Sequence, residues 1–325
     1  MSKAQVDTFT RRDALGGALS LLGLSMPLVG RMAVAADVVN PPPFRESDWR
    51  PVDSQLASIP ECKGERLTHQ PEHLPTCKVM IDNEGTVFLT SVQHVVRHGI
   101  SQPRRREPDG KLAGAPVPPG GGYSLKMLAS GAIIRAKVGE SSIDVVVTNG
   151  HVLAPAKGDI RAVEFLDPLM DLSVIDKAVV TRNALDTGAL PVGRLAEGVT
   201  DDNLTSQIVS FCSKGRGHFR FTGTPTRIAV PIPSHAPADQ RFSVFVMRVP
   251  SELGDIRNEL IGLSGSPVYI EQTKEIVGVF AKCYPRHNVP LLRPDGSRAP
   301  IYVLFAGPDS LRAKVMACAT AALDR

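Results

Sequence analysis

The chain has 325 residues, 42% of them hydrophobic, which is enough for one large domain or two small ones. Glycine (28) and proline (27) are abundant and aromatic residues make up only 5%, a composition typical of short strands joined by turns, with a largely aliphatic core. The net charge is +4, and without the first 35 residues 33 basic side chains face 31 acidic ones. Such a near-neutral chain gives no electrostatic case for binding nucleic acid.

Residues 1–35 have the features of a twin-arginine-type signal peptide. The adjacent Arg11 and Arg12 precede a mildly apolar run over residues 14–29, and a small-x-small cleavage motif follows at residues 33–35. An apolar run of about 16 residues is short for a bilayer span, so we expect no stable membrane anchor after cleavage. The sequence therefore predicts export by the twin-arginine translocase and a periplasmic or secreted bacterial protein.

Residues 36–80 are Pro-rich and polar, and are predicted to form an N-terminal extension. A mature N-terminus beyond residue 80 would identify this extension as a pro-segment that covers the site. The mature chain keeps five cysteines, and an oxidising compartment permits disulfides with at least one thiol left over. Cys62 and Cys77 are the predicted pair, because both lie in this polar segment. No cysteine or histidine spacing typical of a metal site occurs, so neither metal nor cofactor is expected.

From residue 86 onwards short β-type runs dominate, rich in β-branched residues and bounded by Gly, Pro, Asn or Asp. They lie at residues 86–89, 132–134, 145–147, 162–166, 172–175, 208–211, 242–246, 268–270, 276–280 and 301–305. We predict an all-β fold of two antiparallel six-stranded β-barrels, over residues 81–185 and 186–308. Pro308 to Ser310 begin a C-terminal helix that occupies residues 309–325.

Three segments carry residues suited to nucleophilic catalysis. His151 stands at the exit of an apolar strand, Asp171 opens another strand, and Ser264 lies in the turn Gly-Leu-Ser-Gly-Ser-Pro. A serine hydroxyl needs an imidazole to take its proton, and the imidazole needs a carboxylate on its other nitrogen. The tetrahedral intermediate needs preorganised donors, here the backbone N–H groups of Gly262 and Ser264. We therefore predict His151, Asp171 and Ser264 as catalytic residues, with Gly262 and Ser264 as the oxyanion hole.

These segments resemble the motifs of bacterial trypsin-like serine peptidases. Val-Thr-Asn-Gly-His-Val is similar to the family's histidine motif, and Asp-Leu-Ser-Val-Ile to its Asp-Leu-Ala-Val-Ile acid motif. Gly-Leu-Ser-Gly-Ser-Pro is similar to Gly-Asn-Ser-Gly-Gly-Pro, and its ending occurs in members such as glutamyl endopeptidases. The resemblance covers roughly residues 128–320. It implies a double-barrel serine endopeptidase that acts on polypeptides through a Ser-His-Asp triad.

The acid is the least regular of the three motifs. Asp171 follows His151 by 20 positions, which is shorter than is usual for the family and leaves room for one short helix and one strand. Asp167 and Asp176 are the fallback acids. Asp176 ranks last, because alternation along the strand places it on a different face from a strand-opening Asp171.

Two further positions concern the substrate. Ala281-Lys282-Cys283 stands where many family members have Ser-Trp-Gly, so an unusual substrate edge is expected. Asn258 falls six positions before Ser264, where the family's pocket-floor residue would stand. A neutral amide there predicts no simple preference for basic side chains, and the sequence leaves the substrate itself open.

Two alternatives remain. One is a double-barrel protein that keeps the fold and binds a partner without cleaving it. The other rests on Arg97-His98-Gly99, which resembles the histidine acid phosphatase signature Arg-His-Gly-x-Arg-x-Pro, with His98 as the phosphate nucleophile. Against the phosphatase, Ser101 replaces the second arginine, no His-Asp dipeptide follows, and the strand pattern lacks the alternating helices of a parallel sheet.

Overall fold

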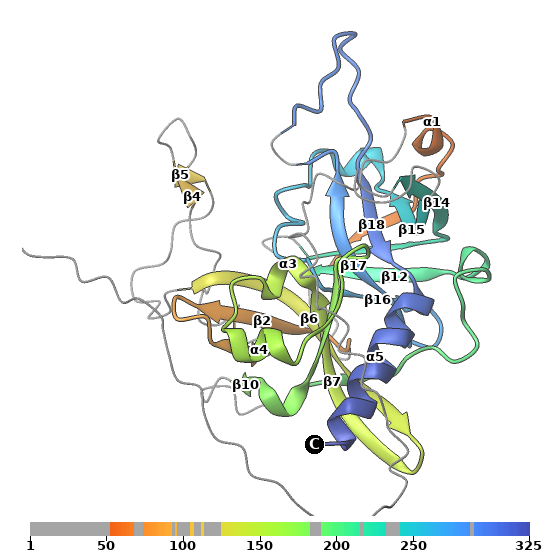
Figure 1. Ribbon diagram of the computed structural model, residues 1–325. Helices are drawn as coiled ribbons and strands as arrows, with labels where there is room; N and C mark the ends of the chain where they lie inside the picture. Colours follow the sequence, from red (N-terminus) through yellow and green to blue (C-terminus); the bar gives the residue numbers. More distant parts are fainter. Residues whose placement is uncertain are drawn as a thin grey trace, which may run out of the picture. The chain divides into compact units, whose positions relative to one another are not determined.

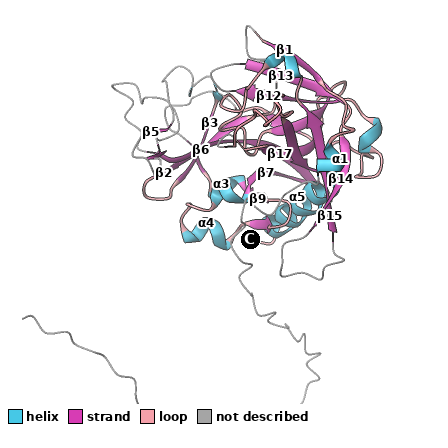
Figure 2. Ribbon diagram, turned by 90° about the horizontal axis from the view of Figure 1, so that it is seen from above, coloured by secondary structure: helices cyan, strands magenta, loops and turns pink. Residues whose placement is uncertain are grey.

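The computed structural model describes residues 53–67, 74–92, 95, 105–106, 112–113, 125–182, 190–214, 218–231, 241–286 and 289–325. All of them belong to one compact unit, Pro41–Arg325. The predicted signal peptide and the phosphatase-like motif around His98 lie outside the described residues. Strands dominate, and the longest described helix lies at the C-terminus (Figure 2). No described helix has the length and apolar character needed to cross a membrane.

The first sheet has eight strands, and seven of them follow the order β10-β3-β2-β6-β7-β9-β8. Their bounds are β2 Cys77–Asp82, β3 Val87–Thr90, β6 Leu125–Val138, β7 Ser141–Asn149, β8 Phe165–Asp167, β9 Leu172–Asp176 and β10 Thr181–Arg182; β11 Val192–Gly193 pairs with β6. The neighbours are antiparallel, except for the two-residue pairs of β10 with β3 and β11 with β6. Aliphatic residues such as Val79, Ile133, Val146 and Ile175 fill its core.

The second sheet also has eight strands, in the order β1-β13-β12-β16-β17-β18-β15-β14, and all its pairings are antiparallel. Their bounds are β1 Lys63–Arg66, β12 Val209–Lys214, β13 His218–Gly223, β14 Thr226–Pro231, β15 Arg241–Arg248, β16 Pro267–Ile270, β17 Ile276–Tyr284 and β18 Tyr302–Ala306. Its core contains stacked phenylalanines, among them Phe211 and Phe221 with ring centroids 4.8 Å apart. The low overall aromatic content therefore hides a local concentration in this sheet.

The C-terminal helix connects the two sheets. α5 (Pro308–Leu323) follows β18 of the second sheet, and lies beside β7 of the first (Figure 1). Leu311, Val315, Cys318 and Ala319 are fully buried against residues of both sheets. The remaining elements are short: α1 Asp53–Leu56, α3 Gly150–Leu153, α4 Gly158–Ala162, η2 Lys177–Val179, η3 Leu204–Ser206, η4 Ser251–Leu253, and the two-stranded ribbon of β4 Arg105–Arg106 and β5 Leu112–Ala113.

The all-β prediction with a C-terminal helix is confirmed, whereas the closed six-stranded barrels are not. Among the described residues each sheet is open, because its two end strands do not pair with each other. The end strands are β1 and β14 in one sheet and β10 and β8 in the other. The predicted runs do not include β1, β2, β10, β11, β13 and β14, which raise the number of strands in the two sheets. The run at residues 162–166 is also split, because α4 ends at Ala162 and β8 begins only at Phe165.

The segment expected to be an extension contributes strands to both sheets. Leu56 and Ile59 are each 2% exposed and pack in one cluster with residues of β14, β15 and β18. β1 then forms the end of the second sheet, and β2, which begins at Cys77, lies between β3 and β6 of the first. A few well-placed apolar residues are enough to anchor this otherwise polar stretch.

The predicted disulfide between Cys62 and Cys77 is wrong. None of the five cysteines, all of which lie in described positions, forms a disulfide. Cys62 lies beside the second sheet, where its N–H donates to Arg248, whereas Cys77 is a buried residue of the first sheet. Burial also raises the pKa of the Cys62 thiol to about 12, which favours its protonated form near neutral pH.

Candidate functional site

His151 is presented by the end of a buried strand. β7 pairs with β6 and β9, and its residues Val145 to Val147 are at most 1% exposed. The strand ends at Asn149, and the short helix α3 begins at Gly150, so His151 lies in the first turn after the sheet. Its side chain is 28% exposed, which leaves the ring accessible from solvent.

Asp171 is hydrogen-bonded to His151 through both carboxylate oxygens. Its Oδ2 lies 2.5 Å from His151 Nδ1, and its Oδ1 accepts the backbone N–H of His151 at 2.9 Å. The Asp171 carbonyl in turn accepts the N–H of Gly150 at 3.0 Å and Nδ2 of Asn149 at 2.8 Å. Because a carboxylate accepts, Nδ1 carries a proton and Nε2 is the ring nitrogen that can take one.

The backbone of Asp171 is also unusual. Its φ of +50° lies in the left-handed region, at the end of the turn that joins β8 to β9. Aspartate tolerates this conformation better than most residues, yet it still costs about 1 kcal/mol. Strain of this kind persists where the surroundings hold it in place, which here are the four hydrogen bonds to His151, Gly150 and Asn149.

The two fallback acids are used elsewhere. Asp167 accepts the N–H groups of Leu169 and Met170 and the hydroxyl of Ser310. Asp176 caps the helix η2 and pairs with Arg325 at 2.8 Å. Of the three acids weighed from the sequence, the structure brings Asp171 to His151. Between His151 and Asp171, 20 positions apart, the chain completes α3 and forms α4 and β8, one element more than expected.

The loop that carries Ser264 is pressed against the first sheet. The Ser264 carbonyl accepts the N–H of Ser130 at 2.9 Å. Gly265 has a φ of +86°, and a Cβ on it would lie 2.1 Å from the Ser130 carbonyl oxygen and 2.3 Å from Thr148 Oγ1. Since Thr148 precedes His151 by only three residues on β7, this contact places the half-buried Ser264 beside the end of the strand that presents His151.

The backbone N–H groups of this loop fall into two sets, those with a protein acceptor and those without one among the described residues. The N–H groups of Leu263, Gly265 and Ser266 donate to the carbonyls of Leu260, Phe280 and Leu263, at 3.2, 2.9 and 2.7 Å. In the described part of the chain, no protein acceptor is found for the N–H groups of Gly262 and Ser264. These are the two donors predicted from the sequence to form the oxyanion hole.

Sequence reasoning missed two residues of this site, Lys78 and Ser130. Lys78 on β2 is only 3% exposed, and its Nζ donates to Ser130 Oγ at 2.8 Å and to the Gly262 carbonyl at 3.2 Å. The Ser130 hydroxyl donates to the same carbonyl at 2.8 Å. The signal that could have found Lys78 is a single lysine in the otherwise apolar run Cys-Lys-Val-Met-Ile.

The strand β17 continues beyond its pairing with β16. β16 pairs with β17 only as far as Val279, and residues 282–284 of β17 are register partners of β18, after an irregularity between Phe280 and Lys282. β17 passes next to the serine loop, because Phe280 exchanges backbone hydrogen bonds with Gly265 and Ser266. Asn258 lies exposed on a turn rather than buried beneath a pocket.

Arg257 links the loop before Ser264 with the loop that follows β17. It is 5% exposed, donates twice to Asp255 at 2.8 Å, and donates through Nη1 to the carbonyls of Arg286 and Val289 at 2.5 and 2.6 Å. The hydrogen bonds from Arg257 lower the pKa of Asp255 from its ordinary value. The loop before Ser264 is therefore tied to the loop after β17.

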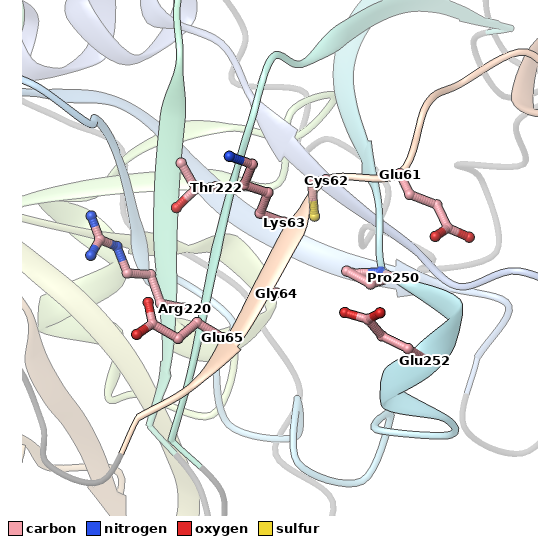
Figure 3. Close-up of a pocket in the computed structure, with 9 residues that line it drawn as sticks. All are labelled: Glu61, Cys62, Lys63, Gly64, Glu65, Arg220, Thr222, Pro250 and Glu252. Carbon is pink, nitrogen blue, oxygen red and sulfur yellow. The ribbon is translucent and has the colours of Figure 1, made fainter.

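A cavity of about 570 Å³ lies at a different place, on β1 and β13 (Figure 3). Its lining includes Glu65 and Lys63, which are register partners of Arg220 and Thr222, and Glu252 from η4. It contains none of the predicted catalytic residues. Its lining carries charges of both signs, from Glu61, Glu65, Glu252, Lys63 and Arg220. No cluster of metal-binding side chains occurs among the described residues.

No protein-family model matches the chain, and no curated protein is significantly similar to it.

Proposed function

We propose that this protein is an exported serine endopeptidase of the trypsin-like, double β-barrel class. The contact between His151 Nδ1 and Asp171 Oδ2, at 2.5 Å, carries the proposal. It is the contact that fixes the tautomer of a catalytic imidazole and stabilises the imidazolium once it forms. The docking of the Ser264 loop against Ser130 of β6, and against Thr148 near the end of β7, which leads to His151, supports the assignment of the nucleophile.

In the proposed reaction, Ser264 Oγ attacks the carbonyl carbon of a peptide bond while His151 Nε2 takes the hydroxyl proton. The carbonyl electron pair moves onto oxygen, which binds the N–H groups of Gly262 and Ser264. When the carbonyl forms again, the C–N bond breaks and His151 gives its proton to the leaving amine. Water then attacks the acyl-serine by the same route, which releases the acid and restores Ser264. The reaction uses no metal or cofactor.

A polypeptide is the proposed substrate class. The serine of the turn Gly-Leu-Ser-Gly-Ser-Pro, flanked by the backbone N–H groups of Gly262 and Ser264, suits attack on the carbonyl of a peptide bond. The near-neutral mature composition supports no role for nucleic acid.

Export through the twin-arginine translocase to the periplasm or beyond is part of the proposal, and it rests on residues 1–35. Signal cleavage before Ala36 would leave residues 53–67 in the mature chain, where Leu56 and Ile59 are buried. Mass spectrometry of the exported protein tests this part. An N-terminus near Ala36 is the expected result, and a chain that keeps Arg11 and Arg12 after export would contradict it.

A fluorophosphonate probe tests the chemistry. We expect the wild-type protein to be labelled on Ser264, and labelling to be lost in Ser264→Ala and in His151→Ala. Ser266→Ala is the matched control, because this second serine of the motif is 1% exposed and its Oγ has no hydrogen-bond partner among the described residues. The control should be labelled like the wild type.

The alternatives give different results in the same assay. Absence of labelling in the correctly processed wild type would overturn the peptidase and favour a binding protein with this fold. A phosphatase would be unlabelled and would lose its activity in His98→Ala. The antiparallel sheets of the described residues do not suit that alternative.

A further inference from the structure

The Gly262–Leu263 peptide is held at both ends. Its carbonyl oxygen accepts Lys78 Nζ at 3.2 Å and Ser130 Oγ at 2.8 Å. Its N–H donates to the Leu260 carbonyl at 3.2 Å, and the Leu263 side chain is fully buried. This peptide lies between the two whose N–H groups belong to Gly262 and Ser264. Fixing it therefore restricts the backbone rotations on either side, which set where those two N–H groups point.

We propose that Lys78 and Ser130 are positioning residues, which hold the Gly262–Leu263 peptide so that the two flanking N–H groups converge on the oxyanion. The proposal rests on the proposed peptidase function and deepens it. Neither residue touches the substrate. Each acts through the backbone of the serine loop, across 184 and 132 positions of sequence respectively.

The conformation of Gly262 makes this support necessary, and we call the two side chains, Lys78 and Ser130, the clamp. Gly262 has a φ of +85°, in a region that glycine enters and leaves at little cost. Without a partner for its carbonyl, the peptide could rotate and carry the donors out of alignment. A charge-assisted hydrogen bond is about twice as strong as a neutral one, so an ammonium group is an effective anchor for a single carbonyl.

The burial of Lys78 argues that it is kept for a purpose. Burying an ammonium group costs several kcal/mol unless its hydrogen bonds are satisfied, and an apolar residue would fill a strand interior without that cost. The neighbours Val79 and Met80 are apolar residues at most 1% exposed. Lys78 departs from this pattern at a position whose side chain reaches the serine loop.

Ser130 holds the same loop with two groups and is itself joined to β7 by a third. Its N–H donates to the Ser264 carbonyl at 2.9 Å, its hydroxyl donates to the Gly262 carbonyl, and its own carbonyl accepts Thr148 Oγ1 at 2.8 Å. The backbone of Ser264 and the Gly262–Leu263 peptide are thereby both held by a single residue of β6. A change at its hydroxyl should move the oxyanion donors and leave the backbone anchor of Ser264 in place.

The test uses Lys78→Met, Ser130→Ala and the double variant, each with a melting curve. On a small ester substrate we expect kcat to fall about 100-fold with KM little changed, since a misplaced oxyanion donor acts only in the transition state. Affinity for a peptide aldehyde, which forms a tetrahedral adduct with the serine, should fall by a similar factor. Lys137→Met, at an exposed lysine of β6, is the matched control and should change neither.

The outcomes separate the two proposals. A wild-type protein that takes no fluorophosphonate label overturns the peptidase and the clamp together. A labelled wild type, with folded Lys78→Met and Ser130→Ala variants that keep full kcat and aldehyde affinity, overturns the clamp alone. Failure of both variants to fold would assign the pair a purely structural role and overturn it too. If the clamp is right, the double variant loses no more than about the larger single loss, because both groups act on one carbonyl.

Discussion

The two halves of the candidate site are built in opposite ways. His151 and Asp171 are 20 residues apart, and the contacts that orient them come from Asn149, Gly150 and the turn between β8 and β9. The loop of Ser264 is instead held from outside, by Lys78 at a separation of 184 residues and by Ser130 at 132. The proposed acid and base half is therefore held by contacts that are local in sequence, while the proposed nucleophile half is held by contacts with residues of the first sheet.

Removal of the N-terminal segment should have the largest effect. A chain that begins at residue 81 lacks β1 and most of β2, and with them Lys78. We expect no folded protein. A chain that begins at residue 68 keeps β2 but loses the buried Leu56 and Ile59, which should cost about 3–6 kcal/mol of the free energy of unfolding.

Thermal melts of the two truncated chains check this expectation. It opposes the pro-segment hypothesis drawn from composition. A stable, active form that begins beyond residue 80 would restore that hypothesis, and would show that neither β1 nor Lys78 is required by the nucleophile half.

Asp171→Asn tests the local half. The amide keeps an oxygen that can accept the His151 N–H, but it cannot hold the imidazole in the required tautomer, so kcat should fall about 10⁴-fold while the protein stays folded. Asp167→Asn is the matched control. Its carboxylate lies in the same turn but serves Leu169, Met170 and Ser310, so kcat should hardly change. Ester hydrolysis measures both, and equal losses would show that the acid is misassigned.

The contact between His151 and Asp171 could be predicted from local motifs, whereas the contacts that hold the Ser264 loop could not. His151, Asp171 and Ser264 each stand in a short motif whose residue types the proposed chemistry requires, and strands around them show in the β-branched runs. Lys78 shows no such pattern, because its role depends on which strand of one sheet faces a loop from the other. The predicted disulfide between Cys62 and Cys77 failed for the same reason. The two residues are near in sequence, but they lie beside different sheets.

Gly265→Ala tests the docking of the nucleophile half. A Cβ there would lie 2.1 Å from the Ser130 carbonyl oxygen, and alanine also resists a φ of +86°. We expect a loss of about 3 kcal/mol or more of the free energy of unfolding, together with loss of probe labelling. Gly139→Ala is the control, because its φ is +60° with nothing within 4 Å, so it should cost only about 1 kcal/mol and keep labelling. Equal effects would mean that backbone strain, and not contact between the sheets, limits the loop.

The smallest effect is expected at the ion pair between Asp255 and Arg257, within the loop before Ser264. Hydrogen bonds from Arg257 lower the pKa of Asp255 below its ordinary value. The pair therefore contributes stability above the unfolded pKa, and that contribution is lost as the pH falls through the folded pKa. Because the Asp255 side chain is 40% exposed, Asp255→Asn should cost about 1 kcal/mol or less near pH 7 and nothing in strong acid. Urea unfolding from about pH 7 to about pH 2 measures the difference.

Asp202→Asn, which removes an 89% exposed carboxylate paired with Arg227, is the control and should show a smaller difference. A gap between wild type and Asp255→Asn that does not narrow in acid would mean that Arg257 holds the loops through the carbonyls of Arg286 and Val289 alone.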